Sequence, residues 1–315
     1  MSSLGELRSL TVSRRRSGAR SPKPRARDNI TGYLFLAPWL IGLVVFTIGP
    51  MVASLVLSFT HYDLLTPPRW AGFGNIVRMA QDERLWHSFG ITVLYVVVSV
   101  PLQLILALAL ALVLDRGMRG LSFYRSVFYL PSLMGGSVAI AILWRQVFGK
   151  DGLVNGFLAV FGIDGPGWIS HPDFALWTLV LLHVWTFGSP MVIFLAGLRQ
   201  IPEMYHEAAA VDGAGKVRRF FSITFPLLTP IIFFNLVLQM IFAFQSFTQA
   251  YIVSGGTGGP SDSTLFYTLY LYQNAFTAPI DMGYASTMAW FLLLVIAGFT
   301  GINFWLSRYW VFYDD

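Results

Sequence analysis

The chain has 315 residues, of which 55% are hydrophobic and only 12% are charged. This composition is typical of a membrane protein and excludes an ordinary soluble globular domain. The absence of cysteine excludes a disulfide framework, thiol catalysis and thiolate metal sites.

The N-terminal segment, residues 1–29, is rich in Ser, Arg and Pro and has no apolar periodicity. We therefore expect a disordered basic tail. The run Arg14–Arg16 is most simply an orientation signal at the membrane. The apolar stretch that follows is too long for the core of a signal peptide and has no small-residue cleavage site, so we expect no cleavable signal peptide.

Six long apolar segments follow the tail. A helix needs about 20 predominantly apolar residues to cross a bilayer. Segments of that kind occupy residues 33–59, 89–114, 126–148, 176–198, 230–253 and 283–307. The chain is therefore predicted to be an all-α polytopic membrane protein with six transmembrane helices. The polar 60–88 loop is expected to carry an interfacial helix around 75–87.

The distribution of Lys and Arg predicts the orientation of these spans. Sixteen of the 21 basic residues lie in the tail, in the 115–125 and 199–229 loops, and after the last span. Four lie in the alternate loops, and Arg145 lies near the end of the third span. Because basic residues concentrate on the cytoplasmic side, both termini and the 199–229 loop are expected in the cytoplasm. The net charge of +5 therefore reflects membrane topology and not nucleic-acid binding.

The 201–226 stretch is the one long, partly charged segment in the second half of the chain. Pro202 suits the first turn of a helix, where its missing N–H has no partner in any case. Glu203 complements the positive end of the helix dipole. Ala208–Ala210 favour a helix and have little bulk. These features predict a short helix that can sit deep in another surface.

Asp212 and Gly213 then break this helix as a turn, and a second helix is expected over 214–225, ended by Pro226. The whole stretch resembles the EAA motif of ABC-importer permeases. The matching residues are Glu207, Ala208, Ala209, Asp212, Gly213, Ala214, Phe220, Ile223, Pro226 and Pro230.

This resemblance implies a type I ABC importer permease fold, with a six-helix permease domain over residues 30–315. In that family the motif forms a cytoplasmic coupling helix, here at about 202–214, which inserts into a cleft on the ATPase subunit. The residues expected to couple to the ATPase are Glu203, Glu207, Ala208, Ala209, Asp212, Gly213, Ala214, Phe220 and Pro226. The glycine-rich loop Ser254–Pro260 also resembles an extracellular loop of the carbohydrate, maltose-type branch.

Polar residues recur along the fifth predicted span. At helical spacing one face carries Asn235, Gln239, Phe242, Ser246 and Gln249. Polar amides in a membrane helix point into protein or into a water-filled path. They can join neighbouring helices, or they can line a translocation path and offer hydrogen bonds and an aromatic surface to a sugar. We favour the path.

Two other functional classes fit the residues less well. A proton-coupled carrier keeps a carboxylate inside the membrane, whereas all 16 acidic residues lie in tails, loops or at span edges. An enzyme needs a nucleophile with a base, or a metal cluster, whereas the five His are scattered and neither HExxH nor Gly-x-Ser-x-Gly occurs. In the fourth span, His183 is expected to make an interhelical hydrogen bond. No Walker loop occurs, because neither Gly-Lys pair precedes Ser or Thr. We therefore expect no catalysis, no metal and no cofactor bound by this chain.

The resemblance implies a membrane-spanning permease subunit of an ATP-driven sugar importer, which forms half of the translocation path and works by alternating access. ATP and Mg²⁺ are then held by a dimeric ABC ATPase in the cytoplasm. The other expected partners are a second permease subunit in a heterodimer, an extracytoplasmic sugar-binding protein, and the lipid bilayer of the bacterial cytoplasmic membrane. The alternative function is a secondary carrier or channel for a neutral polar solute.

Overall fold

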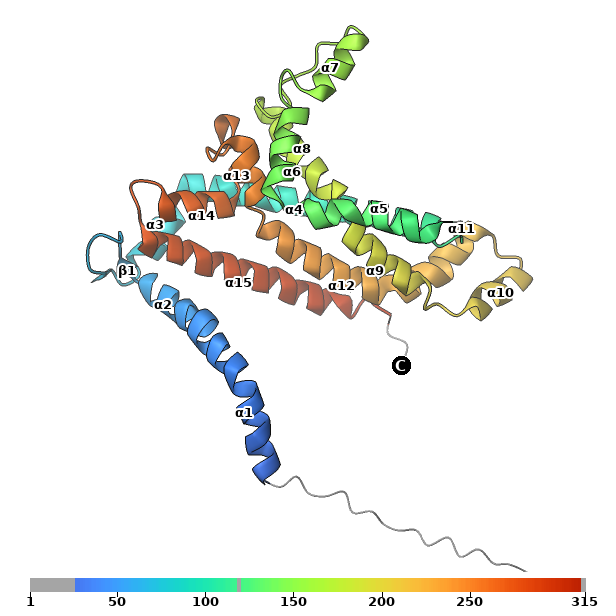
Figure 1. The fold of residues 1–315 in the computed structure, drawn as a ribbon, viewed down its shortest axis with the longest axis horizontal. Coiled ribbons are helices and arrows are strands. Elements are labelled where there is room, and N and C mark those ends of the chain that lie inside the picture. The colour runs from blue at the N-terminus through green and yellow to red at the C-terminus, as the bar shows by residue number, and fades with distance from the viewer. Residues whose placement is uncertain (1–25, 118–119, 313–315) are drawn as a thin grey trace, which may run out of the picture. The chain divides into compact units, whose positions relative to one another are not determined.

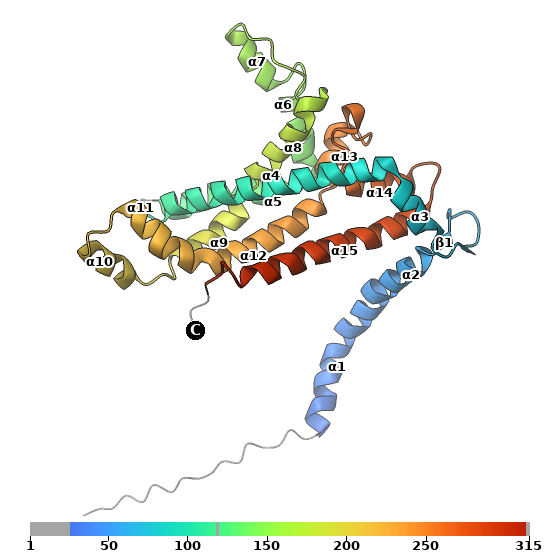
Figure 2. The same cartoon turned by 180° about the vertical axis from the view of Figure 1, so that it is seen from behind.

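The computed structural model describes residues 26–117 and 120–312 (Figures 1 and 2). Most of the predicted tail therefore lies outside the described residues, while residues 26–29 begin the first helix. By its internal contacts the chain divides into two compact units, Met1–Ala53 and Ser54–Asp315.

The first unit contains α1 (Ala26–Leu43), the π-helical turn η1 (Val44–Ile48) and the start of α2 (Gly49–Leu57). Together, the 25 residues Tyr33–Leu57 are long and apolar enough to cross a membrane. Pro50 lies directly after η1, where the Gly49 N–H bonds to the Val44 carbonyl five residues earlier. This widened turn accommodates a proline, which cannot donate to the helical ladder, so the span continues through Pro50.

The second unit begins with an antiparallel pair of two-residue strands, β1 (Thr60–His61) and β2 (Arg69–Trp70), in register Thr60 to Trp70. The next element, α3 (Gly74–Gln81), is shorter than the predicted interfacial helix, because α4 (Glu83–Leu114) begins at Glu83. Asp82 separates the two helices. Its carboxylate accepts the N–H of Leu85 at 3.0 Å and so caps α4.

The remaining elements are α5 (Leu121–Met134), α6 (Val138–Val147), α7 (Leu153–Val160), α8 (Pro172–Trp185), α9 (Gly188–Leu198), α10 (Glu203–Val211), α11 (Lys216–Arg219), η2 (Phe220–Thr224), α12 (Phe225–Phe244), α13 (Thr248–Ser254), η3 (Pro260–Asp262), α14 (Tyr267–Phe276) and α15 (Met282–Ser307). Within the described residues, four continuous helical runs meet the length and hydropathy of a membrane span, and the bent pairs α5–α6 and α8–α9 meet them jointly. Counting each pair as one span yields six spans, as predicted.

The long helix α4 is the centre of the second unit and packs against α8, α9, α12 and α14 (Figures 1 and 2). Half of its twelve buried residues are small or polar: Ser88, Thr92, Ser99, Gln103, Ala107 and Ala111. Small residues let membrane helices approach closely, and hydroxyls or amides then join them. The Thr92 hydroxyl accepts the Tyr267 N–H at 2.8 Å, and the Gln103 amide donates to the Thr186 hydroxyl at 2.9 Å.

The third and fourth spans are bent. α5 and α6 meet at 96° across Gly135–Ser137, and α8 and α9 meet at 41° across Thr186 and Phe187. The Ser137 hydroxyl accepts the Ile140 N–H at 3.3 Å, so α6 starts as a newly capped helix and does not extend α5.

The fifth span differs from its predicted extent of 230–253. The helical run begins at Lys216 and ends at Phe244, so the prediction that Pro226 ends a separate helix is wrong. The reason is the π-helical segment η2, in which the Phe225 N–H bonds to the Phe220 carbonyl. Pro226 follows directly, in the first turn of α12, where the widened segment tolerates its missing donor.

A polar cluster joins the start of α4 to α14 and α15. The second carboxylate oxygen of Asp82 accepts the hydroxyls of Tyr270 at 2.8 Å and Tyr284 at 2.6 Å. Arg84 donates two hydrogen bonds to the carboxylate of Asp262, at 2.8 and 2.9 Å. These contacts link segments nearly 200 residues apart in the sequence and hold the 255–266 loop against α4.

This cluster predicts a specific acid sensitivity. Partial burial opposes ionisation of Asp82, but hydrogen bonds from Tyr284 and Tyr270 hold its pKa below the ordinary value of 3.8. A carboxyl whose pKa is lowered by folding contributes stability that is complete above the ordinary pKa and is lost as the pH falls through the lowered pKa. We expect the melting temperature of the purified protein to fall between pH 5 and about pH 3 more steeply than that of Asp82→Asn, in which position 82 does not titrate. Parallel curves for the two proteins would contradict this role.

Candidate functional site

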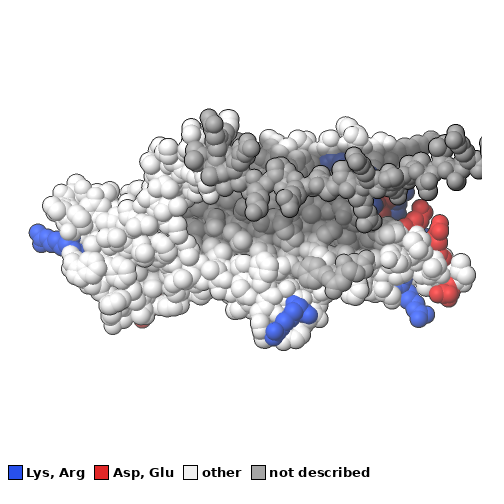
Figure 3. Space-filling model, turned by 90° about the horizontal axis from the view of Figure 1, so that it is seen from below, with Lys and Arg blue, Asp and Glu red and all other residues white. Residues whose placement is uncertain are grey.

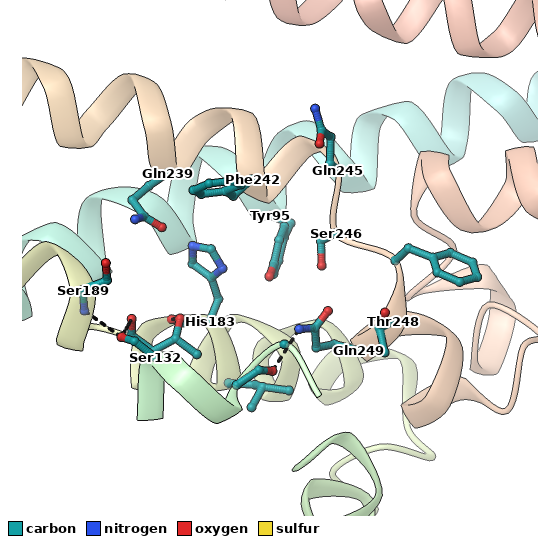
Figure 4. A pocket seen from close by; sticks show the side chains of 15 residues that line it. Tyr95, Ser132, His183, Ser189, Gln239, Phe242, Gln245, Ser246, Thr248 and Gln249 are labelled. Atoms are coloured by element: carbon teal, nitrogen blue, oxygen red, sulfur yellow. Dashed lines mark hydrogen bonds between the residues drawn. The ribbon is translucent and has the colours of Figure 1, made fainter. Parts of the chain in front are cut away.

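A pocket of about 440 Å³ lies where three spans are interrupted (Figure 4). Gly135 and Gly136 come from the bend between α5 and α6, and Thr186 comes from the bend between α8 and α9. Residues 245–247 come from the break between α12 and α13, and residues 248 and 249 begin α13. Irregular backbone at membrane depth is tolerated only where it is buried in protein or lines a water-filled cavity. The three breaks are therefore accounted for by a cavity at this position.

Side-chain hydrogen bonds hold the three breaks in place. The Gln249 amide donates to the Gly135 carbonyl at 3.0 Å. The Ser132 hydroxyl donates to the Thr186 carbonyl at 2.8 Å and accepts the Ser189 N–H at 2.7 Å. These bonds satisfy backbone groups that the breaks release from the helical ladders, so the pocket is preformed.

The rest of the lining combines neutral polar groups with aromatic rings. In Figure 4, Gln239, His183, Tyr95 and Ser246 point toward the same space, and Phe242 lies across one side of it. The Nε2 atom of His183 is buried and has no hydrogen-bond partner among the described residues. Among the residues that the structure describes, the lining contains no Asp, Glu, Lys or Arg. Such a site can exchange hydrogen bonds with a neutral polar ligand and offers an aromatic face to its apolar surface.

Four of the five residues predicted on one face of the fifth span meet in this pocket: Gln239, Phe242, Ser246 and Gln249. They do so on two elements, because α12 ends at Phe244 and Gln249 belongs to α13. Asn235 is elsewhere. It is buried in α12, and its amide donates to the Ile231 carbonyl of its own helix at 3.1 Å.

The other polar lining residues were not predicted as site residues: Tyr95, Ser132, His183, Thr186, Ser189, Gln245 and Thr248. Each is a polar residue in an apolar segment, and this is the one feature of the sequence that could have suggested a role in a site. Their grouping depends on which helix breaks lie together, and local spacing does not contain that information.

The predicted coupling helix is α10, with Pro202 preceding its first turn and Gly213 ending it. Gly213 has a φ of 75°, in the left-handed region that favours glycine. The Gly213 N–H bonds to the Ala210 carbonyl at 3.1 Å, and the Ala214 N–H bonds to the Ala209 carbonyl at 2.9 Å. These two bonds form the Schellman motif of a helix C-terminus, so glycine is required by the backbone geometry.

This helix exposes both charged and apolar side chains. No residue of α10 is buried, and Met204, Tyr205 and Val211 are 66%, 42% and 89% exposed. Glu207 is exposed and makes no hydrogen bond or ion pair with another described residue. Figure 3 shows acidic and basic side chains gathered at the end of the molecule where Figure 1 places α10 and α11. An apolar and charged surface of this kind, beyond the spans, fits a protein partner.

The structure divides the predicted coupling residues into two groups. Those from Glu203 to Ala214 lie on α10 and its C-terminal turn. Phe220 and Pro226 lie in η2 and at the start of α12, where the Phe220 ring packs against Phe221 and Phe225. One bond between the groups is donated by Arg219, whose guanidinium reaches the His206 carbonyl at 3.4 Å. The structure therefore does not place Phe220 and Pro226 on the surface of α10 itself.

Comparison with known proteins decides the family. Residues 92–310 match the family described as binding-protein-dependent transport system inner membrane component. The probable ABC transporter permease protein YesP of Bacillus subtilis is 54% identical over 291 residues, which cover 92% of this chain and 94% of YesP. The chain belongs to this family. As an ABC importer permease it is a non-catalytic, multi-pass subunit of the inner membrane, and the predicted class of transport protein is confirmed.

Other relatives and solved structures agree with this assignment. The permease is 34% identical to the lactose transport system permease protein LacF of Rhizobium radiobacter, over 92% of this chain and 98% of LacF. A bacterial ABC transporter structure involved in the import of alginate aligns with a TM-score of 0.72 at 21% identity, covering 90% of the permease and 96% of that chain. The predicted all-α type I permease fold is therefore confirmed.

Proposed function

We propose that this permease forms half of the membrane path of an ATP-driven saccharide importer, with the pocket at the three helix breaks as its substrate site. The observation that carries this proposal is the uncharged polar and aromatic lining of the pocket, which suits the hydroxyls and the ring faces of a sugar. Named relatives support the same class. LacF is a lactose permease, and MalF of Thermococcus litoralis, 30% identical over 291 residues, is a trehalose/maltose permease.

The energy source in this proposal is a cytoplasmic ABC ATPase dimer, which binds ATP and Mg²⁺ and receives α10 in a cleft. Glu207 offers a free carboxylate to it, and Ala208 and Ala209 let the helix enter closely. ATP binding draws together the coupling helices of two different permease subunits, and the path opens outward. Both termini and α10 then lie in the cytoplasm. A secondary carrier or channel does not dock an ATPase, so the exposed apolar and charged surface of α10 favours the importer.

On the outer side, a sugar-binding protein delivers the substrate. A solved neighbour at 19% identity and a TM-score of 0.74 is an alginate transporter in complex with its alginate-bound periplasmic protein.

The proposal is tested by purifying the tagged permease in mild detergent, identifying what accompanies it, and measuring saccharide uptake after reconstitution. We expect an ATPase and a second permease to co-purify, and ATP-dependent uptake of a di- or oligosaccharide when its binding protein is added. A permease that purifies alone and conducts a solute without ATP would overturn the proposal.

His183 provides a test of the pocket itself. His183→Leu removes a buried hydrogen-bonding group, and one neutral hydrogen bond is worth about 0.5–1.5 kcal/mol. We expect the uptake KM of His183→Leu to rise by roughly two- to tenfold, with His183→Gln between it and the native protein. Ser99→Ala is the control, since the Ser99 hydroxyl is buried, has no hydrogen-bond partner among the described residues and does not line the pocket. An unchanged KM in His183→Leu would place the substrate elsewhere.

A further inference from the structure

The helix α5 carries most of its polar side chains on one face, with Tyr124 off that face. At 100° per residue, Ser122, Arg125, Ser126, Tyr129 and Ser132 fall within about 120° of the helix, an arc that also contains Leu133. Val127 and Leu130 lie outside this polar arc and are 40% and 50% exposed. α5 packs against α9 and α4, and none of its residues is fully buried.

A second pocket, of about 400 Å³, lies against this polar face. Its lining comes from Ser122, Arg125, Ser126 and Tyr129 of α5 and from the start of α9. Ser189 lines both this pocket and the substrate pocket. The two spaces are therefore neighbours, and they meet where the Ser132 hydroxyl accepts the Ser189 N–H.

Arg125, on this polar face, has a charged side chain that needs a polar environment. Its guanidinium makes no hydrogen bond or ion pair with any other residue that the structure describes. Arg125 lies near the start of α5, at the end that the charge distribution predicts to be cytoplasmic, and a charged side chain there points to water or to a polar partner and not to lipid. The hydroxyls of Ser122, Ser126 and Tyr129 beside it also need water or a polar partner.

We propose that the polar face of α5 is the inner half of the translocation path, along which the substrate moves from the pocket toward the cytoplasm. This inference rests on the proposed import function and adds the route and its residues. The substrate enters at Ser132 and Ser189, passes Tyr129 and Ser126, and leaves beyond Arg125 and Ser122. Their hydroxyls and the guanidinium exchange hydrogen bonds with saccharide hydroxyls in turn, so no single step strips the substrate of all its partners.

The absence of native cysteine makes this route directly testable. Single variants Ser122→Cys, Ser126→Cys, Val127→Cys and Leu130→Cys would be assembled into the complete transporter and treated with a membrane-impermeant methanethiosulfonate from the cytoplasmic side. Serine and cysteine are nearly equal in size, so the path variants should fold. We expect Ser122→Cys and Ser126→Cys to react at least about tenfold faster than the two variants outside the polar arc, because only ionised thiols in contact with water react quickly. Equal rates at all four positions would overturn the proposal.

A second measurement uses the charge of Arg125. In Ser126→Cys, an anionic methanethiosulfonate should react faster than a cationic one, because the guanidinium attracts the anion in the same space. We expect Arg125→Gln to lower this anion-to-cation rate ratio by about tenfold. An unchanged ratio would show that Arg125 faces away from the path, for instance into a contact with the second permease, and would overturn the assignment.

These outcomes are separable from the import function. Uptake and ATP hydrolysis by the native complex test whether the protein imports a saccharide at all. If the native complex imports a saccharide and Ser126→Cys reacts no faster than Val127→Cys, the α5 route alone is wrong. If the native complex imports no saccharide, the proposed function is wrong, whatever the labelling rates.

Discussion

Replacing Glu207 with alanine is expected to abolish ATP-driven uptake while leaving the fold of the permease unchanged. Glu207 is exposed on α10 and makes no hydrogen bond or ion pair with another described residue, so its removal costs the isolated chain very little. A charged hydrogen bond to a partner protein is worth about 1.5–3 kcal/mol, which corresponds to a roughly ten- to 150-fold weaker association with the ATPase.

The measurement compares the native permease, Glu207→Ala and Glu207→Gln for ATP-driven uptake and for retention of the ATPase during purification. The matched control is Asp164→Ala, because Asp164 is another exposed carboxylate without a described partner and lies in the loop after α7. We expect the control to retain full uptake. Full uptake by Glu207→Ala would remove α10 as the coupling element, whereas lost uptake together with a lowered melting temperature would indicate a folding defect.

Much of this architecture follows from local sequence patterns. The spans are predictable because each is a long apolar segment, and crossing a bilayer demands such a segment whatever surrounds it. α10 is predictable because Pro202 and Gly213 act through their own backbone geometry: a missing N–H at the start and a left-handed φ at the end. The structure places that helix at Glu203–Val211, within the predicted 202–214.

The breaks within the spans were not predictable from the same patterns. Gly135 and Gly136 are compatible with a continuous membrane helix as well as with a 96° bend, and packing decides between the two. Pro226 normally ends a helix, yet the π-helical segment before it lets the helix continue. The pocket exists only because three such breaks meet. Spacing along the fifth span predicted part of its lining. Tyr95, Ser132 and His183 lie on other spans, and their place in the pocket could not be predicted from spacing.

The close contact between α5 and α9 depends on Gly188, and replacing this glycine is expected to have a large effect on stability and uptake. A Cβ added to Gly188 would lie 2.4 Å from the Phe128 carbonyl oxygen and 2.8 Å from the Cα of Tyr129. Both are backbone atoms of α5, which cannot rotate away as a flexible side chain can. Gly188→Ala must therefore push the two helices apart, and overpacking of this kind costs about 1–3 kcal/mol or more.

We expect Gly188→Ala to lower the melting temperature of the purified protein by roughly 5–10 °C and to abolish most of its uptake. The loss of uptake follows from position: the Ser132 hydroxyl, which joins α5 to the bend between α8 and α9 beside the pocket, would lie 2.9 Å from the same added Cβ. The matched control is Gly90→Ala in α4, where an added Cβ meets no atom within 4 Å. In the control, alanine favours the helix by about 0.5–1 kcal/mol, so the melting temperature should stay the same or rise. Equal melting temperatures for the two variants would mean that α5 and α9 are not in close contact at Gly188, and the bond between Ser132 and Ser189 that borders the proposed substrate site would then lose its structural basis.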